Sequence, residues 1–170
     1  MSSAEDAIRR RRQQAADATE LERRQHAQAA ANARERLIRE VEELVPQALK
    51  GLERAGWPEG RLVKIPRFLG SKEIAAWPVG GFAFHSKEDD SVFVNKLFLL
   101  SDGRWAYGVS FDINRGSSAT PRSFREIVEG FAGTAGRPGM LLVSDLPQGV
   151  VERLTELAAE DSARPYRSRS

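Results

Sequence analysis

Apolar residues are spaced differently in the two parts of the N-terminal region. Between residues 4 and 33, Ala, Arg, Gln and Glu dominate, and Ile8 and Leu21 are the only large apolar side chains. Over residues 34–55, apolar side chains recur at helical spacing, at Leu37, Val41, Leu44, Val45, Ala48, Leu49 and Leu52. Both compositions favour helix, but only the second provides a stripe that can pack on a core. We therefore predict an exposed, charged helical arm over residues 1–33 and an amphipathic helix over 34–55.

Proline and glycine mark where this helical region bends and ends. Pro46 lies inside the apolar stripe and lacks a backbone N–H, so we expect a kink or a short break near Val45, with a second helix restarting at the proline. Gly56, followed by Trp57 and Pro58, is typical of the end of a helix. The helical region should therefore stop before residue 58.

From residue 61 to residue 114 the apolar pattern has the period of β-strands. A first strand over 62–68 carries Pro66, which places it at a sheet edge. A second strand, with Phe82 and Phe84, follows Pro78-Val79-Gly80-Gly81, and a third covers 92–100. The fourth is the clearest, because large apolar residues alternate with small or polar ones after the turn-forming Asp102-Gly103 pair, at Trp105, Tyr107, Val109, Phe111 and Ile113. The pattern predicts that strands two to four form an antiparallel meander.

The C-terminal part returns to helical spacing. Thr120 followed by Pro121 has the form of a helix N-cap, which predicts a helix over 121–132. Residues 140–144 are apolar enough for a short fifth strand.

A last helix is expected over 146–160, because Asp145 and Gln148 have capping-box spacing ahead of an apolar stripe. The tail 161–170 is rich in Arg and has no apolar pattern, so we predict a disordered basic tail.

These elements together predict an α+β fold. A long N-terminal helical arm precedes a single domain over 34–160, with an antiparallel β-meander sheet of four to five strands within 61–114 and nearby, and two C-terminal helices packed on one face.

Charge and composition narrow the possible functions. The chain has 26 Lys and Arg against 24 Asp and Glu, a net charge of +2, so the protein as a whole lacks the strong positive charge of many nucleic-acid-binding proteins. It has no cysteine, which excludes disulfides, thiolate zinc sites and a cysteine nucleophile. No apolar run approaches the length of a membrane span. We expect a cytoplasmic protein with no membrane partner, and the Ala-, Arg- and Gly-rich usage hints at a GC-rich bacterium or its phage.

The arm carries the residues that we expect to bind a partner. Acid-first pairs four residues apart, such as Glu20 and Arg24, support an exposed helix but supply no core. We predict a non-enzymatic interaction or adaptor protein, whose arm docks on another protein or another copy through Ile8, Arg9, Arg10, Arg11, Arg12, Leu21, Arg23 and Arg24. A nucleic-acid-binding accessory role stays open, because Arg9 to Arg12 and the Arg-rich tail offer guanidinium groups for phosphates.

One group of polar residues in the sequence suggests an enzymatic role as an alternative. His85 is followed by an acidic stretch that includes Asp89, and Asp112 and Asn114 leave the fourth strand. A histidine with carboxylates can relay a proton or bind a divalent ion. The stretch around Asp89 also reads as a plain hairpin loop, so we expect no catalytic residue, no metal and no cofactor.

Overall fold

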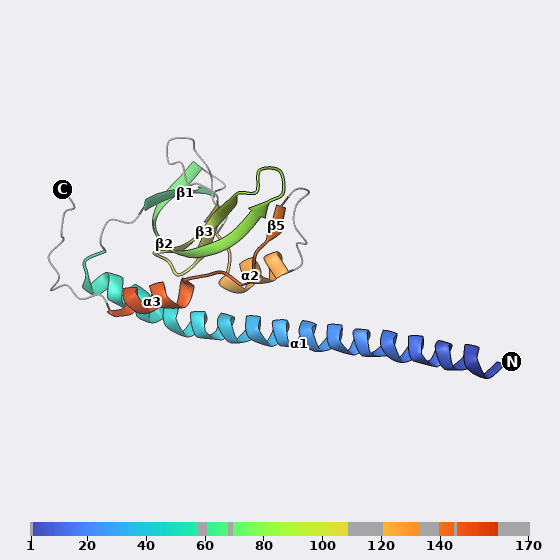
Figure 1. The fold of residues 1–170 in the computed structure, drawn as a ribbon. Helices are drawn as coiled ribbons and strands as arrows, with labels where there is room; N and C mark the ends of the chain where they lie inside the picture. Colours follow the sequence, from blue (N-terminus) through green and yellow to red (C-terminus); the bar gives the residue numbers. More distant parts are fainter. Residues whose placement is uncertain are drawn as a thin grey trace. The chain divides into compact units, whose positions relative to one another are not determined.

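A computed structural model describes residues 2–57, 61–67, 70–108, 121–132, 140–144 and 146–159 (Figure 1). The chain divides into two units, Met1–Arg36 and Leu37–Ser170. The α+β class, the long N-terminal helix, the antiparallel sheet and the two C-terminal helices that the sequence predicts are all confirmed. The predicted strand residues Val109, Phe111 and Ile113 and the tail 161–170 lie outside the described residues.

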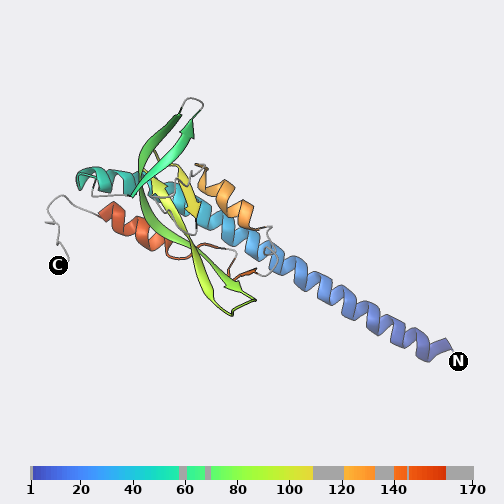
Figure 2. The same cartoon turned by 90° about the horizontal axis from the view of Figure 1, so that it is seen from above.

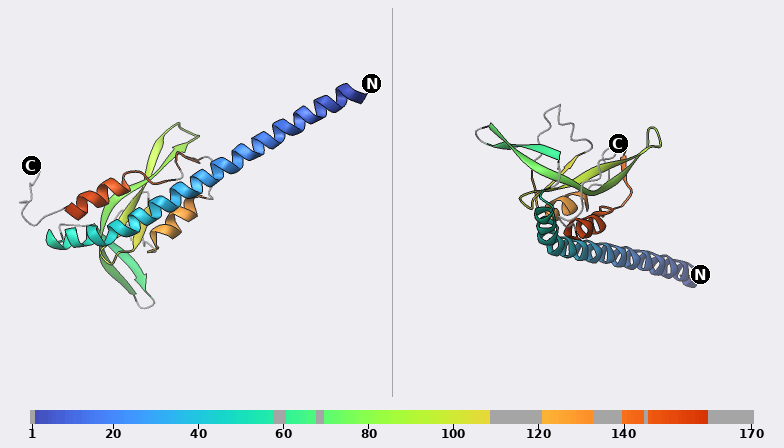
Figure 3. Two further views of the ribbon diagram at one scale, coloured as in Figure 1. Left: turned by 90° about the horizontal axis from the view of Figure 1, so that it is seen from below. Right: turned by 90° about the vertical axis from the view of Figure 1, so that its left-hand side faces the viewer.

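Helix α1 (Ser2–Arg54) contributes its last turns to the core of the second unit. Ile38, Val41, Ala48 and Leu52 are buried there, as the apolar stripe predicts. Of the kink or short break predicted near Val45, the break is wrong, because α1 continues through Pro46 without interruption. Buried residues on both sides of the proline hold the helix against the core, and the axis changes direction in the last turns (Figure 3).

The end of α1 is fixed by local backbone geometry. Gly56 has a φ of 73°, and its N–H donates to the carbonyl of Glu53, while the N–H of Trp57 donates to the carbonyl of Leu52 at 2.8 Å. These two bonds form a Schellman motif, which needs a left-handed residue that glycine adopts without steric penalty. The predicted helix end at Gly56 is therefore confirmed.

Three long antiparallel strands make the body of the sheet. They are β1 (Arg61–Arg67), at the edge as Pro66 predicts, β2 (Gly70–Ser86) and β3 (Val92–Leu100). Strand β2 spans the sheet and joins the β1–β2 hairpin to the β2–β3 hairpin at its other end (Figure 2). The short strands β4 (Trp105–Gly108) and β5 (Met140–Leu142) pair with β3 and β2, respectively.

A β-bulge lies in the segment after which the sequence predicts the second strand. That strand does not begin after residue 81, because residues 78–81 continue β2, and the register with β3 shifts between Pro78 and Gly80. The extra residue changes which alternate positions face the helices: Trp77 faces them before the bulge and Phe82 after it, although one number is odd and the other even. The Pro-Gly-Gly composition therefore marks an irregular strand, not its end.

Both C-terminal helices begin later than the sequence predicts, for the same reason. Helix α2 (Phe124–Ala132) cannot start at Pro121, because Arg122 pairs with Trp105 through two backbone bonds of 2.8 and 2.9 Å. Helix α3 (Val150–Ala159) cannot start at residue 146, because Gln148 pairs in the same way with Gly81. In each case extended pairing with the sheet holds the residues that local sequence would place in a helix. Thr120 and Asp145 lie outside the described part of the chain.

The sheet and the helices of the second unit form two layers. Helices α2 and α3 lie on either side of the last turns of α1, beneath one face of the sheet (Figure 3). The shared core joins all three helices to the sheet and includes Ile38, Leu52, Phe82, Leu97, Leu99, Ile127, Leu154 and Leu157. Trp77 is only 5% exposed within it. A smaller cluster occupies the other face of the sheet, with Ile65, Ile74, Ala76, Phe98, Leu100 and Ala106.

Candidate functional site

The first unit consists of one helix, and its apolar side chains are exposed. Every side chain from residue 6 to residue 29 is exposed, including Ile8 at 54% and Leu21 at 57%. A single helix has no second element in its own unit on which to bury them. The structure therefore places both predicted apolar contact residues at the surface of the arm.

The predicted basic residues of the arm surround the helix instead of forming one face. Successive residues are about 100° apart, so Arg9 to Arg12 point in four directions. Ile8, Arg9 and Arg12 line one shallow hollow with Gln13, which a single helix cannot close into a pocket. Arg24 pairs with Glu20 at 2.9 Å, as the four-residue spacing predicts.

Small residues recur along one side of the arm. Ala7, Ala18 and Ala29 are each 11 residues apart, which is close to three full helical turns, so they lie nearly in line. The Gln28 amide donates to the Asn32 side-chain oxygen at 2.9 Å farther round the helix. Side chains as small as alanine let another helix approach closely. This spacing is visible in the sequence, but the predicted contact set does not include it.

The predicted polar site around His85 is a hairpin turn. His85 lies at the end of β2, and its Nε2 is 2.6 Å from Oδ1 of Asp90 in the turn that leads to β3. Hydrogen bonds from Ser86 and Ser91 lower the pKa of Asp89, which keeps this carboxylate engaged within the turn. The turn thus pairs His85 with Asp90, whereas Asp89 is bonded to Ser91.

Asp112 and Asn114 lie outside the residues that the structure describes. Within the described ranges, no group of three His, Asp or Glu side chains is arranged to hold a metal ion. The geometry therefore adds nothing to the enzymatic alternative.

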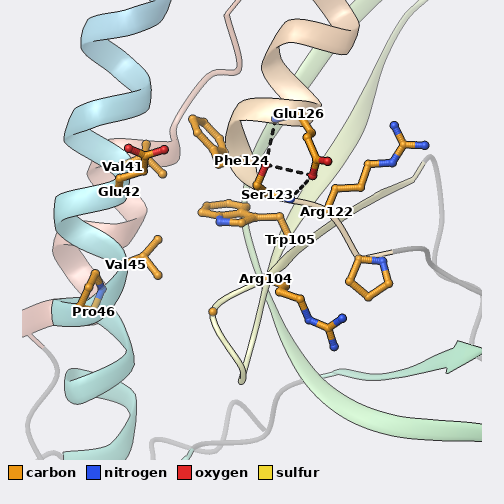
Figure 4. A pocket seen from close by; sticks show the side chains of 12 residues that line it. Val41, Glu42, Val45, Pro46, Arg104, Trp105, Arg122, Ser123, Phe124 and Glu126 are labelled. Carbon is orange, nitrogen blue, oxygen red and sulfur yellow. Dashed lines mark hydrogen bonds between the residues drawn. The ribbon is translucent and has the colours of Figure 1, made fainter. Parts of the chain in front are cut away.

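A groove of about 480 Å³ opens within the second unit (Figure 4). Helix α1 forms one wall with Val41, Glu42, Val45 and Pro46. The opposite wall comes from the turn before β4 and from the start of α2, with Arg104, Trp105, Arg122, Ser123, Phe124 and Glu126. Three distant segments of the chain meet here, so sequence reasoning missed the groove. The feature of the sequence that pointed toward the groove was Trp105, on the predicted strand with the clearest alternation.

Some charged side chains on the walls of the groove form an ion pair with a described residue, and others do not. Arg104 donates to Asp102 from Nε at 2.8 Å and from a terminal nitrogen at 2.5 Å. Burial alone would raise the pKa of Asp102, but these bonds and the Arg104 charge outweigh it and lower the pKa. Arg122 and Glu42, on opposite sides of the groove, form no ion pair with any described residue (Figure 4). One carboxylate and one guanidinium group at the groove are therefore without an ion-pair partner among the described residues.

Ser123 and Glu126 cap helix α2 at the edge of the groove. The Ser123 hydroxyl accepts from the Glu126 N–H at 3.1 Å, and the Glu126 carboxylate accepts from the Ser123 N–H at 2.8 Å and from its hydroxyl (Figure 4). The backbone bond first, and then the hydroxyl bond, lower the pKa of Glu126. This reciprocal arrangement is a capping box, and it orients the first turn of α2.

Trp105 places a hydrogen-bond donor at the floor of the groove. The residue is 2% exposed and its ring lies 4.8 Å from that of Phe124. Within the described chain its indole N–H has no acceptor, yet it is not among the buried polar atoms sealed from solvent. The N–H therefore reaches the groove that Trp105 lines.

The sequence matches no family model, no curated protein and no solved structure. Among the helices of the described residues, none combines the length and the apolar character of a membrane span. The arm, the hairpin turn and the groove are thus the features from which function must be inferred.

Proposed function

We propose that this chain is a non-enzymatic interaction protein whose N-terminal arm docks on another protein molecule. The observation that carries the proposal is the exposure of Ile8 and Leu21 on a helix without a core of its own. Burial of one such side chain is worth about 1.5–3 kcal/mol. A partner that covers both residues gains binding free energy that the arm cannot obtain from its own unit.

The stability of a lone helix supports the same proposal. Isolated helices are marginal in water, because nucleation is costly and only local bonds repay it. Ion pairs such as Glu20–Arg24 add only about 0.3–0.5 kcal/mol each. Docking against a second surface supplies the apolar contacts that keep most protein helices folded. The row of Ala7, Ala18 and Ala29 gives such a surface room to approach.

A nucleic-acid-binding role is the second candidate. The side chains of Arg9, Arg10, Arg11 and Arg12 are exposed and form no ion pair with any described residue. Four free guanidinium groups on adjacent positions can meet phosphates, and binding of that kind weakens steeply as salt is raised. A chain that binds no RNA or DNA duplex at low salt counts against this role. Binding that persists at high salt, or that does not depend on these arginines, counts against the part assigned to them.

Removal of residues 1–32 tests the interaction role. We expect the full chain to form assemblies larger than one molecule, or to retain a protein that the shortened chain does not, when both are compared by light scattering after gel filtration and by affinity capture. The shortened chain should stay folded and monomeric, because the core residues begin at Ile38. If both forms are monomeric and capture the same proteins, the arm has no docking role.

A further inference from the structure

The groove around Trp105 presents groups that lack partners. Its walls are apolar at Val41, Val45 and Pro46, and its floor carries the Trp105 N–H, which has no acceptor among the described residues. Its two sides carry Glu42 and Arg122, neither of which forms an ion pair with a described residue, although the Arg122 charge also acts on Glu126 nearby. A donor or a charge in an apolar site gains most from a partner that also excludes water. The groove therefore suits a ligand with an apolar centre, a hydrogen-bond acceptor, and one charge of each sign.

One face of the arm has this combination. Leu21 is exposed, Asp17 lies four residues before it, and Arg24 lies three residues after it, which places all three side by side on a helix. Gln25 adds a side-chain carbonyl next to Leu21. Ala18 is small enough to let the helix backbone approach a wall closely.

We infer that the groove of one copy binds the Leu21 face of the arm of a second copy. This inference rests on the proposed function, in which the arm docks on another protein molecule. Leu21 enters between Val45 and Trp105, Asp17 meets Arg122, and Arg24 meets Glu42. The Gln25 carbonyl accepts from the Trp105 N–H. The chain thus provides both the groove and its ligand.

The order of charges sets the direction of docking. Asp17 and Arg24 are seven residues apart, about 10 Å along a helix axis, and they flank Leu21 on either side. Arg122 and Glu42 also flank the groove on opposite sides (Figure 4). The reverse orientation would place Asp17 beside Glu42 and Arg24 beside Arg122, and like charges at an interface disfavour that arrangement.

Little has to be broken for this contact to form. Neither Asp17 nor Arg122 forms an ion pair with a described residue. The Arg122 backbone is paired with Trp105, and its charge helps to lower the pKa of Glu126 on the same wall, but docking breaks neither interaction. Arg24 would leave Glu20, but that pair is exposed on both sides, at 75% and 52%, and such surface pairs contribute little. The exchange of one exposed ion pair for one at the rim of an apolar groove favours the docked state.

A charge-reversal cycle tests the contact. Sedimentation equilibrium is measured on the full chain, on Asp17→Arg, on Arg122→Asp and on the double variant, with circular dichroism to confirm folding. We expect reversible self-association of the wild type, a weakening of about tenfold in each single variant, and recovery to within about threefold in the double variant. Lys87→Asp is the matched control, because Lys87 is exposed in the turn between β2 and β3, lies neither on the arm nor in the groove, and undergoes the same change in charge as Arg122→Asp.

The outcomes separate this inference from the function on which it rests. Self-association that is lost without residues 1–32 but unchanged in both single variants overturns the groove assignment and leaves the arm as a docking element. A full chain that is monomeric at every concentration overturns docking on a second copy. In that case, capture of a different protein that requires the arm supports the proposed function, and the lack of such capture contradicts it.

Discussion

Replacement of Gly51 by alanine is expected to lower the free energy of unfolding by about 3 kcal/mol, although alanine is the better helix former by about 1 kcal/mol. The reason is the contact between α1 and α3. A Cβ atom at position 51 would lie 1.9 Å from the backbone oxygen of Leu157 and 3.0 Å from the Cα of Ala158. Arg54 also donates to the carbonyl of Ala158 at 2.6 Å, so the two helices must separate to admit the methyl group.

Gly130→Ala is the matched control for this prediction. Gly130 also lies within a helix, α2, but nothing is within 4 Å of the position that its Cβ would take. Alanine there should raise the free energy of unfolding by up to about 1 kcal/mol. Urea unfolding followed by tryptophan fluorescence measures both variants. An equal gain at both positions would show that α1 and α3 do not approach as closely as described.

Ser123→Ala is expected to lower the free energy of unfolding by about 1 kcal/mol at neutral pH. The variant removes the hydroxyl that accepts from the Glu126 N–H and leaves that donor at the start of α2 without its cap. Thr155→Ala is the control, because the Thr155 hydroxyl bonds to the carbonyl of Val151 inside α3 and caps nothing. That change should alter stability by less than about 0.5 kcal/mol. Equal effects in the two variants would contradict the capping role.

The same cap makes stability depend on pH in a defined direction. Because the pKa of Glu126 is lowered in the folded protein, its contribution is complete above the ordinary glutamate value of 4.5 and is lost as the pH falls through the lowered pKa. Ser123→Ala keeps the backbone N–H that donates to Glu126, so most of this acid dependence should remain. Glu126→Gln should remove it. Urea unfolding at neutral and acid pH distinguishes the two variants.

Local sequence determines the parts of this fold that were predicted correctly. The change in apolar spacing near Leu37 marks where α1 begins to contribute core residues, and Gly56 ends the helix through bonds to residues only a few positions away. Strand β3 has the predicted bounds, 92–100, because apolar residues fill it and polar turns flank it. Each of these features depends on near neighbours, which the sequence shows directly.

Pairing between distant segments accounts for the predictions that were wrong. Arg122 and Gln148 are held in extended form by Trp105 and Gly81, and this delays both C-terminal helices. Gly80 has a φ of 135°, and a Cβ there would lie 2.3 Å from the carbonyl oxygen of Gln148, so its glycine serves close contact inside a strand. Local helix and strand propensities do not reflect contacts between distant segments.

One part of the candidate site could be predicted from local sequence, and the other part could not. The exposed Leu21 of the arm follows from its isolation among polar residues, which the sequence shows. The groove does not, because Val45, Trp105 and Arg122 come together only after the sheet and α2 have formed. Identifying Leu21 from the sequence was therefore possible, but identifying the groove was not.

Hydrogen–deuterium exchange of the full chain over a range of protein concentrations tests most directly whether another molecule holds the arm. Docking predicts that the amides of residues 6–29 become more protected as the concentration rises, while those of α3 keep the same protection. Leu21→Glu should abolish the concentration dependence. Arm amides that exchange at one rate at every concentration, in the wild type as in the variant, would contradict docking between copies.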